Sequence, residues 1–147
     1  MNFDSNKQFE KYKKIGKFKL SSGGTSSYYY DIKEAMGEPE NLREIVRELD
    51  KEHNFRNIDV IIGIEYGGVP MAVGLSLYTS IPFAVIRNSE KQHGTQKRIE
   101  GYQKVGRVLL LDDVKTSGRS IKDAKDYLKS KGYTITATST VITRWWR

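Results

Sequence analysis

Two adjacent carboxylates follow a short apolar run in the second half of the chain. Val108–Leu111 is a run of four apolar residues, too short for a helix, and Asp112 and Asp113 come directly after it. This pattern predicts a buried strand that ends in a loop. Paired carboxylates at the end of a strand accept hydrogen bonds from neighbouring hydroxyls, such as those of a sugar.

The residues after the acids are small, hydroxylated or basic, and they lead into a predicted helix. They are Val114, Lys115, Thr116, Ser117, Gly118, Arg119 and Ser120. Hydroxyls and backbone N–H groups at a helix N-terminus bind anions, because the helix dipole favours negative charge there. The run from Val108 to Ser120 therefore predicts a sugar-phosphate site. The acid pair taken alone also fits a simple helix cap.

A second loop with glycines follows an earlier predicted strand. Residues 58–64 are mostly apolar, and Tyr66, Gly67 and Gly68 come before a predicted helix over 71–78. Glycine lets the backbone approach a ligand closely, and the start of a helix supplies free amides. We expect a second anion site here, built from backbone groups.

A long polar stretch separates two of the predicted strands. Residues 87–101 show no apolar period, and they include Arg87, Lys91 and His93. A polar segment of this length between core strands is either disordered or a functional lid.

The elements that must position these residues alternate along the chain. We predict strands at 58–64, 82–86, 108–112 and 133–143, and helices at 39–53, 71–78 and 120–131. Near the N-terminus, Phe9, Tyr12 and Ile15 predict a short helix that ends at Gly16. The alternation predicts an α/β fold with a mostly parallel sheet flanked by helices. The polar segments follow strands, where such sheets bind their ligands.

Composition excludes several kinds of chemistry. The chain has 147 residues, no Cys and two His, which rules out Cys/His zinc sites, thiol nucleophiles and disulfides. The net charge of +7 suits nucleic acid and small polyanions equally, so it does not decide between them. The first residues do not resemble a signal peptide, and no apolar run approaches the ~20 residues of a membrane span. We expect a soluble, cytoplasmic protein without a membrane partner.

The run from Val108 to Ser120 resembles the phosphoribosyl-pyrophosphate (PRPP) motif of the type I phosphoribosyltransferases. That motif is an apolar strand, two acids, Val, any residue, Thr, a small residue, Gly, any residue and Ser. The run is neither a Walker loop nor a dinucleotide fingerprint. The resemblance implies the type I phosphoribosyltransferase fold for a single domain over 1–147. It also implies a small N-terminal hood at about 1–35 and a core at 36–147.

Three further segments resemble the orotate enzymes of this family. In this chain, Ser21, Ser22, Gly23, Tyr29 and Tyr30 resemble the hood segment that covers the pyrimidine in these enzymes. Arg87, Lys91, His93 and Gly94 resemble their catalytic lid. An Arg that grips the pyrimidine carboxylate corresponds to Arg144, at the end of the last predicted strand. Several positions depart from common forms. Asn88 stands where Lys is usual, Gly67 and Ser21 stand where some relatives have Lys, and Gly24 stands where some have a basic residue. Around Arg144, Thr143 stands where Asp is usual, and Trp145 and Trp146 where an acid follows.

The resemblance implies a role for each matched residue. Catalysis is expected from Lys91, His93, Asp112 and Asp113. PRPP contacts are expected from Tyr66, Gly67, Gly68, Arg87, Lys91, His93, Asp112, Asp113, Val114, Lys115, Thr116, Ser117, Gly118, Arg119 and Ser120. Orotate contacts are expected from Ser21, Tyr29, Tyr30, Thr116 and Arg144.

The implied reaction is the transfer of the phosphoribosyl group of PRPP to orotate, a step of pyrimidine synthesis. It requires Mg²⁺ held mainly by PRPP, with no metal ligand from the protein, and a homodimer with shared active sites. No nucleic-acid partner is expected. Two alternatives remain. A transferase for another base should lack the Lys-x-His lid and the serine-glycine-aromatic hood. A PRPP-binding regulatory protein with the same fold should carry an added DNA-binding segment or a lost lid.

Overall fold

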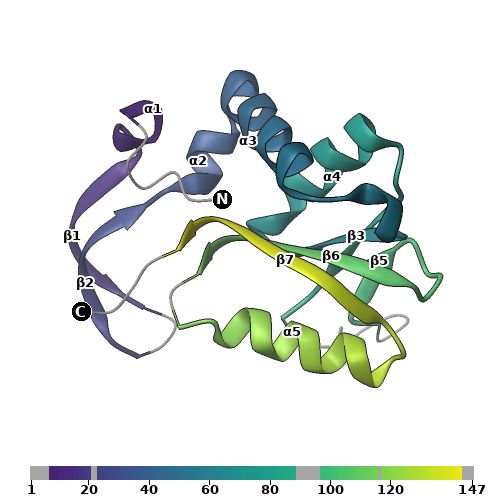
Figure 1. Cartoon of the computed structure of the whole chain (residues 1–147). Coiled ribbons are helices and arrows are strands. Elements are labelled where there is room, and N and C mark those ends of the chain that lie inside the picture. The colour runs from purple at the N-terminus through teal and green to yellow at the C-terminus, as the bar shows by residue number, and fades with distance from the viewer. Residues whose placement is uncertain (1–6, 21–22, 89–96, 116, 144–147) are drawn as a thin grey trace.

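A five-stranded sheet forms the centre of the structure, a computed structural model that describes residues 7–20, 23–88, 97–115 and 117–143. The strands lie in the order β5-β4-β3-β6-β7, and Figure 1 shows their arrangement. Their bounds are β3 Val60–Ile64, β4 Phe83–Ile86, β5 Ile99–Gly101, β6 Arg107–Lys115 and β7 Thr134–Thr143. All neighbours pair in parallel except β5, which is antiparallel to β4 at one edge.

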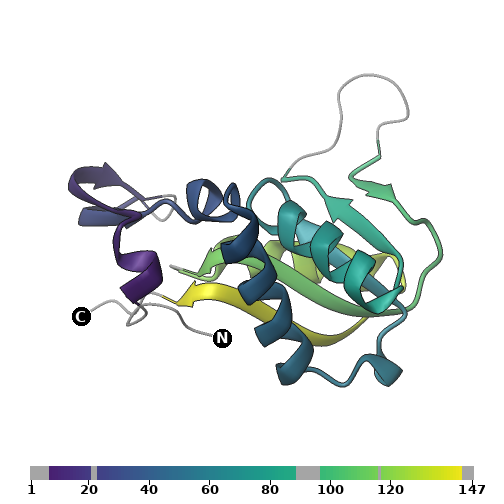
Figure 2. The same ribbon diagram turned by 90° about the horizontal axis from the view of Figure 1, so that it is seen from above.

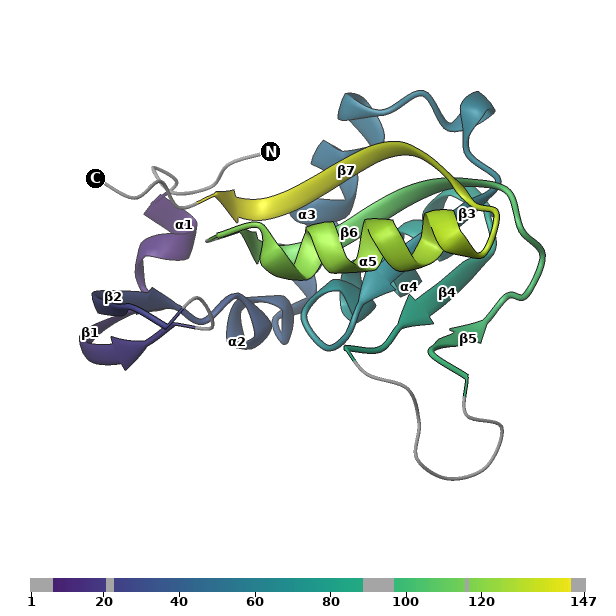
Figure 3. The same cartoon turned by 90° about the horizontal axis from the view of Figure 1, so that it is seen from below.

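Helices cover both faces of this sheet. Helices α3 (Pro39–Glu52) and α4 (Gly68–Thr79) lie over one face (Figure 2), and α5 (Arg119–Ser130) lies over the other (Figure 3). Alternate residues of each strand therefore enter different cores: Leu109 packs with the α3 and α4 side, and Leu110 with the α5 side. Burial on both faces explains why the strands read as unbroken apolar runs instead of alternating ones.

An N-terminal hairpin stands beside the sheet. It consists of β1 (Lys13–Lys19) and β2 (Thr25–Tyr30), preceded by α1 (Lys7–Glu10) and followed by α2 (Ile32–Met36). Figure 1 shows it projecting from one end of the molecule. The buried side chains of Phe9, Tyr12 and Tyr30 join the core cluster under α3 and α4 and so anchor the hairpin to the sheet.

The predicted helix from Phe9 to Gly16 is wrong beyond its first turn. Helix α1 ends at Glu10, and Ile15 belongs to β1, where it pairs with Tyr28. Phe9 and Tyr12 are buried, but Ile15 is 78% exposed, so its spacing from them does not reflect a shared apolar face. Pairing with the tyrosine-rich strand overrides the local helical pattern.

The predicted fold class is confirmed: a mostly parallel sheet is flanked by helices. Sequence reasoning missed three short elements, α2, β5 and a 3-10 turn at Phe55–Asn57. Each has five residues or fewer, which is too short to show a period. Over the described residues, none of the helices is long and apolar enough to cross a membrane.

Candidate active site

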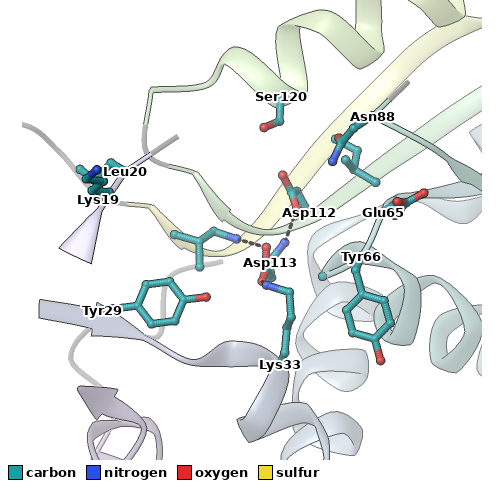
Figure 4. Close-up of a pocket in the computed structure, with 13 residues that line it drawn as sticks. Lys19, Leu20, Tyr29, Lys33, Glu65, Tyr66, Asn88, Asp112, Asp113 and Ser120 are labelled. Atoms are coloured by element: carbon teal, nitrogen blue, oxygen red, sulfur yellow. Dashed lines mark hydrogen bonds and ion pairs between the residues drawn. The ribbon is translucent and has the colours of Figure 1, made fainter. Parts of the chain in front are cut away.

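A cleft of about 300 Å³ opens at the carboxyl ends of β3, β4 and β6 (Figure 4). Residues from distant parts of the chain line it: Lys19, Leu20, Tyr29, Lys33, Ile64, Glu65, Tyr66, Gly67, Asn88, Asp112, Asp113, Val114 and Ser120. Parallel strands bring their carboxyl ends to one edge of a sheet, which is where α/β proteins bind their ligands. The structure thus places the acid pair and the glycine loop after β3 in one cleft.

The acid pair forms the floor of the cleft. Asp112 and Asp113 are each only 8% exposed. The backbone N–H of Asp113 donates to Asp112 Oδ1 at 2.9 Å, and that of Val114 donates to Asp113 Oδ1 at 2.9 Å. Asp113 Oδ2 accepts a hydrogen bond from Lys33 Nζ at 3.0 Å, and Lys33 reaches it from the hairpin side of the cleft. Both carboxylates are therefore held in fixed orientations before any substrate binds.

The electrostatics of the pair are unusual for carboxylates. Burial, and after it the charge of Asp113, raises the pKa of Asp112 from its ordinary 3.8 to about 8. Lys33 acts in the opposite direction and favours the ionised form of Asp112. A buried acid with a strongly shifted pKa in a cleft is typical of a functional site.

The turn between β6 and α5 forms a smaller polar niche beside the floor. The niche has a volume of about 40 Å³ and is lined by Asp112, Val114, Lys115, Ser117, Gly118, Arg119, Ser120 and Ile121. Gly118 adopts a left-handed conformation with φ 78°, which a side chain would disfavour, and α5 begins directly after it. The N–H groups of the first turn of α5 are suited to a small anion such as a phosphate.

The loop after β3 approaches the floor of the cleft closely at two glycines. A Cβ atom on Gly67 would lie 2.1 Å from Asp113 Cγ, and one on Gly68 would lie 2.2 Å from the Leu111 carbonyl oxygen. The loop therefore packs directly against the floor. Tyr66 is 63% exposed and its ring points away from the acids (Figure 4), so this loop offers the cleft mainly backbone groups.

Some predicted site residues lie outside the cleft lining. Tyr29 lines the cleft, but Tyr30 points into the core, and its hydroxyl donates to Glu10 Oε2 at 3.3 Å. Arg87 is not among the residues that line the cleft; its Nε lies 3.8 Å from Glu65 Oε2 and its Nη1 lies 3.8 Å from Glu100 Oε1. Ser21, Lys91, His93, Thr116 and Arg144 lie outside the described residues.

Sequence reasoning also missed cleft residues, above all Lys33. Its ammonium meets a carboxylate 80 residues further along the chain. It belongs to the five-residue helix α2, which no sequence pattern revealed. The Asp-Ile-Lys segment carries no signal of its own, so only the packing of the hairpin against the sheet places Lys33 in the cleft.

Comparisons with known proteins agree with this geometry. The family model described as "Phosphoribosyl transferase domain" matches residues 29–144. The orotate phosphoribosyltransferase of Methanocorpusculum labreanum is 44% identical over 130 residues, which cover 88% of this chain and 75% of that protein. The orotate phosphoribosyltransferase of Pyrococcus furiosus is 42% identical over 134 residues, which cover 89% of this chain and 74% of that protein. The chain belongs to the orotate phosphoribosyltransferase family.

A solved structure supports the same assignment. The crystal structure of orotate phosphoribosyltransferase from Aeropyrum pernix superposes with a TM-score of 0.79 at 33% identity, over 91% of this chain and 77% of that one. The predicted resemblance to this family is therefore confirmed. The chain spans about three quarters of the length of these orotate phosphoribosyltransferases.

Because the pKa of Asp112 is raised, we predict that its buried carboxyl lowers the free energy of unfolding at neutral and alkaline pH. Between pH 4 and pH 8 the unfolded chain has lost the Asp112 proton while the folded chain retains it, so the unfolding free energy falls as pH rises. Asp112→Asn keeps the oxygen that accepts from Asp113 N and removes the buried charge. It should raise the unfolding free energy at pH 8 by about 1–3 kcal/mol and flatten the pH dependence.

Urea unfolding followed by circular dichroism at pH 5, 6.5 and 8 measures this difference. Asp126→Asn serves as the control, because Asp126 is an exposed acid whose pKa is lowered by Lys122. That variant should show no gain in stability. An Asp112→Asn protein no more stable than wild type at pH 8 would contradict the electrostatic account of the pair.

Proposed function

We propose that this chain catalyses the transfer of the phosphoribosyl group from PRPP to orotate, giving orotidine 5′-monophosphate and pyrophosphate in pyrimidine biosynthesis. The observation that carries this is the 44% identity to an orotate phosphoribosyltransferase over 88% of the chain. The cleft supports it, because acids suited to a ribose lie next to an anion niche. The absence of Cys is also compatible with the reducing cytoplasm, which we propose as the location.

The floor of the cleft fits the sugar phosphate. We assign the ribose hydroxyls to Asp112 and Asp113, and the 5′-phosphate to the β6–α5 turn, including Thr116. The pyrophosphate lies against the backbone at 66–68. In the reaction the bond from C1′ to the pyrophosphate oxygen breaks, the bond from C1′ to N1 of orotate forms, and the N1 proton leaves to solvent. The buried carboxylates favour the positive charge that develops on the ribose in the transition state.

The leaving pyrophosphate needs its negative charge neutralised, and Mg²⁺ supplies this chemistry when bound. Among the described residues no cluster of three or more acidic, His or Cys side chains forms a cage for a metal. The carboxylate oxygens of the acid pair already accept hydrogen bonds from Lys33 and from backbone N–H groups, so few of them are left to bind a metal. These residues fit a Mg²⁺ that takes most of its oxygen ligands from PRPP and water. From the lid, Lys91 and His93 would add positive charge.

The hairpin side of the cleft fits the planar base. Leu20 and Tyr29 line it there and provide apolar and aromatic contacts. Ser21 and Arg144 would contact the pyrimidine ring and its carboxylate, as the sequence resemblance implies. The orotate carboxylate is what distinguishes this base from uracil, so specificity depends on a cation at that end of the site.

Loss of orotate absorbance on adding PRPP and Mg²⁺ tests the proposed activity. We expect complete conversion to depend on all three components, and to stop when Mg²⁺ is removed by a chelator. Uracil and adenine in place of orotate should react far more slowly. Conversion of uracil at the rate of orotate, or no conversion of any base, would reject this function.

Arg144 is predicted to set the affinity for orotate alone. Losing a charge-assisted contact to a carboxylate costs roughly 1.5–3 kcal/mol, so Arg144→Ala should raise the KM for orotate by about tenfold or more. The KM for PRPP should stay nearly unchanged. Steady-state kinetics with each substrate varied in turn provide the measurement. Arg56→Ala, which removes an exposed Arg outside the cleft, is the control. Equal weakening for both substrates would exclude the assigned role.

We also propose that the protein works as a homodimer with shared active sites. A groove of about 510 Å³ between α3 and α4 is lined by Pro39, Leu42, Arg43, Val46, Arg47, Gly74, Leu77 and Tyr78. Leu77 is 82% exposed and Tyr78 is 58% exposed. Neighbouring large apolar side chains at a surface are typical of a protein interface, and we propose that a second copy of this chain packs on this groove.

Complementation between two inactive variants tests the shared site. Lys91→Ala removes the lid function and Asp113→Asn the floor function, and each homodimer should be almost inactive. When the two are unfolded together and refolded, about half of the dimers are mixed, and each has one intact site of two. Activity should return to roughly a quarter of the wild-type value. Recovery no greater than the mean of the two separate variants would show that each lid serves its own chain.

A further inference from the structure

Lys33 brings a positive charge from the hairpin side of the cleft to its floor. Of the described residues that line the cleft, two are cations, Lys19 and Lys33. Lys33 Nζ lies 3.0 Å from Asp113 Oδ2, and the Asp113 side chain is 11% exposed. Figure 4 shows Lys33 extending from α2 toward the acid pair. This ion pair spans the hairpin segment and the sheet.

The loop after β3 carries no cation of its own beside Asp113, and Lys33 provides one instead. The residues that follow the strand are Glu65, Tyr66, Gly67 and Gly68, none of which is a cation. The Asp113 carboxylate fills the space over Gly67, where a Cβ atom would lie 2.1 Å from Asp113 Cγ. A side chain at position 67 would displace the Asp113 carboxylate from its present position, and in this chain the cation next to Asp113 comes from α2.

The charges around the pair explain why a cation is needed there. Asp113 faces Asp112 on its own strand, Lys33 on α2, and, across the cleft, Tyr29 of β2 and Glu65 after β3. Two buried carboxylates side by side disfavour each other's ionised form. Partial burial opposes the charge of Lys33, but Asp113 and, to a smaller extent, Tyr29 outweigh this and raise the pKa of Lys33 above its ordinary value. Lys33 thus stays protonated and offsets the like charges of the floor.

We propose that Lys33 is a positioning residue, which fixes the orientation of Asp113 and favours the ionised form of Asp112, so that the acid pair accepts the ribose hydroxyls of PRPP. This inference deepens the proposed function and rests on it. Lys33 does not touch the reacting atoms. It acts through Asp113, whose second oxygen it holds while Val114 N–H holds the first.

The test compares pH profiles of Lys33 variants in the orotate assay. With Lys33→Met, kcat/KM for PRPP at pH 7 should fall by about tenfold or more, and the acid limb of its pH profile should move up by about one pH unit or more. Lys33→Arg should restore both. Lys33→Gln keeps a hydrogen-bond donor but removes the charge. If Lys33→Met does not fold, Lys33→Gln should show the same fall in kcat/KM for PRPP and the same shift of the acid limb.

A matched control separates this role from a simple structural tie. Lys14 pairs with Glu34 of α2 at 2.7 Å, in the same segment but outside the cleft lining. Lys14→Met should leave kcat/KM and its pH profile at wild-type values. A Lys33→Met enzyme whose activity falls without any shift of the acid limb would overturn the proposal, because Lys33 would then only hold the hairpin in place. A Lys33→Met enzyme equal to wild type would overturn it as well.

A double-mutant cycle gives an independent measure. Calorimetric titration with PRPP and Mg²⁺ should show weaker binding for Lys33→Met in the wild-type background. In the Asp113→Asn background the same change should have little further effect, because Lys33 acts through Asp113. Equal losses in the two backgrounds would overturn the proposal. Wild-type protein is measured in every series, so its failure to convert orotate would count against the proposed function and not against the role of Lys33.

Discussion

The candidate active site depends on the burial of two adjacent carboxylates near the end of β6. Placing like charges side by side in a poorly solvated position is unfavourable unless other groups hold them. Here two backbone N–H groups and the ammonium of Lys33 provide those contacts. The cost is still visible in the raised pKa of Asp112. A pair that served only as a helix cap would not need such burial, which argues for a role in binding.

The sheet makes this burial possible. β6 lies between β3 and β7, and its residues Leu109, Leu110 and Leu111 are fully buried between helices on both faces. A strand held this firmly keeps the direction of its last residues fixed, so Asp112 and Asp113 need no flexible loop to present them. The anion niche then follows directly, because the chain turns at Gly118 and begins α5. The proposed ribose and phosphate subsites are thus neighbours along the chain.

Sequence reasoning predicted the parts of the fold and site that depend on local patterns. The apolar runs of β3 and β6, the acid pair and the glycine loop are each contained in a short segment, and the structure places them as the α/β pattern predicts. Tyr30 and Lys33 show where this reasoning ends. Whether Tyr29 or Tyr30 faces the cleft depends on the register of β2, and the position of Lys33 depends on how the hairpin packs on the sheet. Neither can be read from one segment alone.

The electrostatics of the floor and the apolar packing of the hairpin are therefore coupled. Phe9, Tyr12 and Tyr30 bury their rings in the core under α3 and α4, which fixes the hairpin and the start of α2. Lys33 sits on the first turn of α2 and can reach Asp113 only while that packing is intact. A loop that carried its own cation after β3 would not need this arrangement, but here the Asp113 carboxylate occupies the space over Gly67. The hairpin segment then completes the charge balance of the floor in addition to lining the proposed base site.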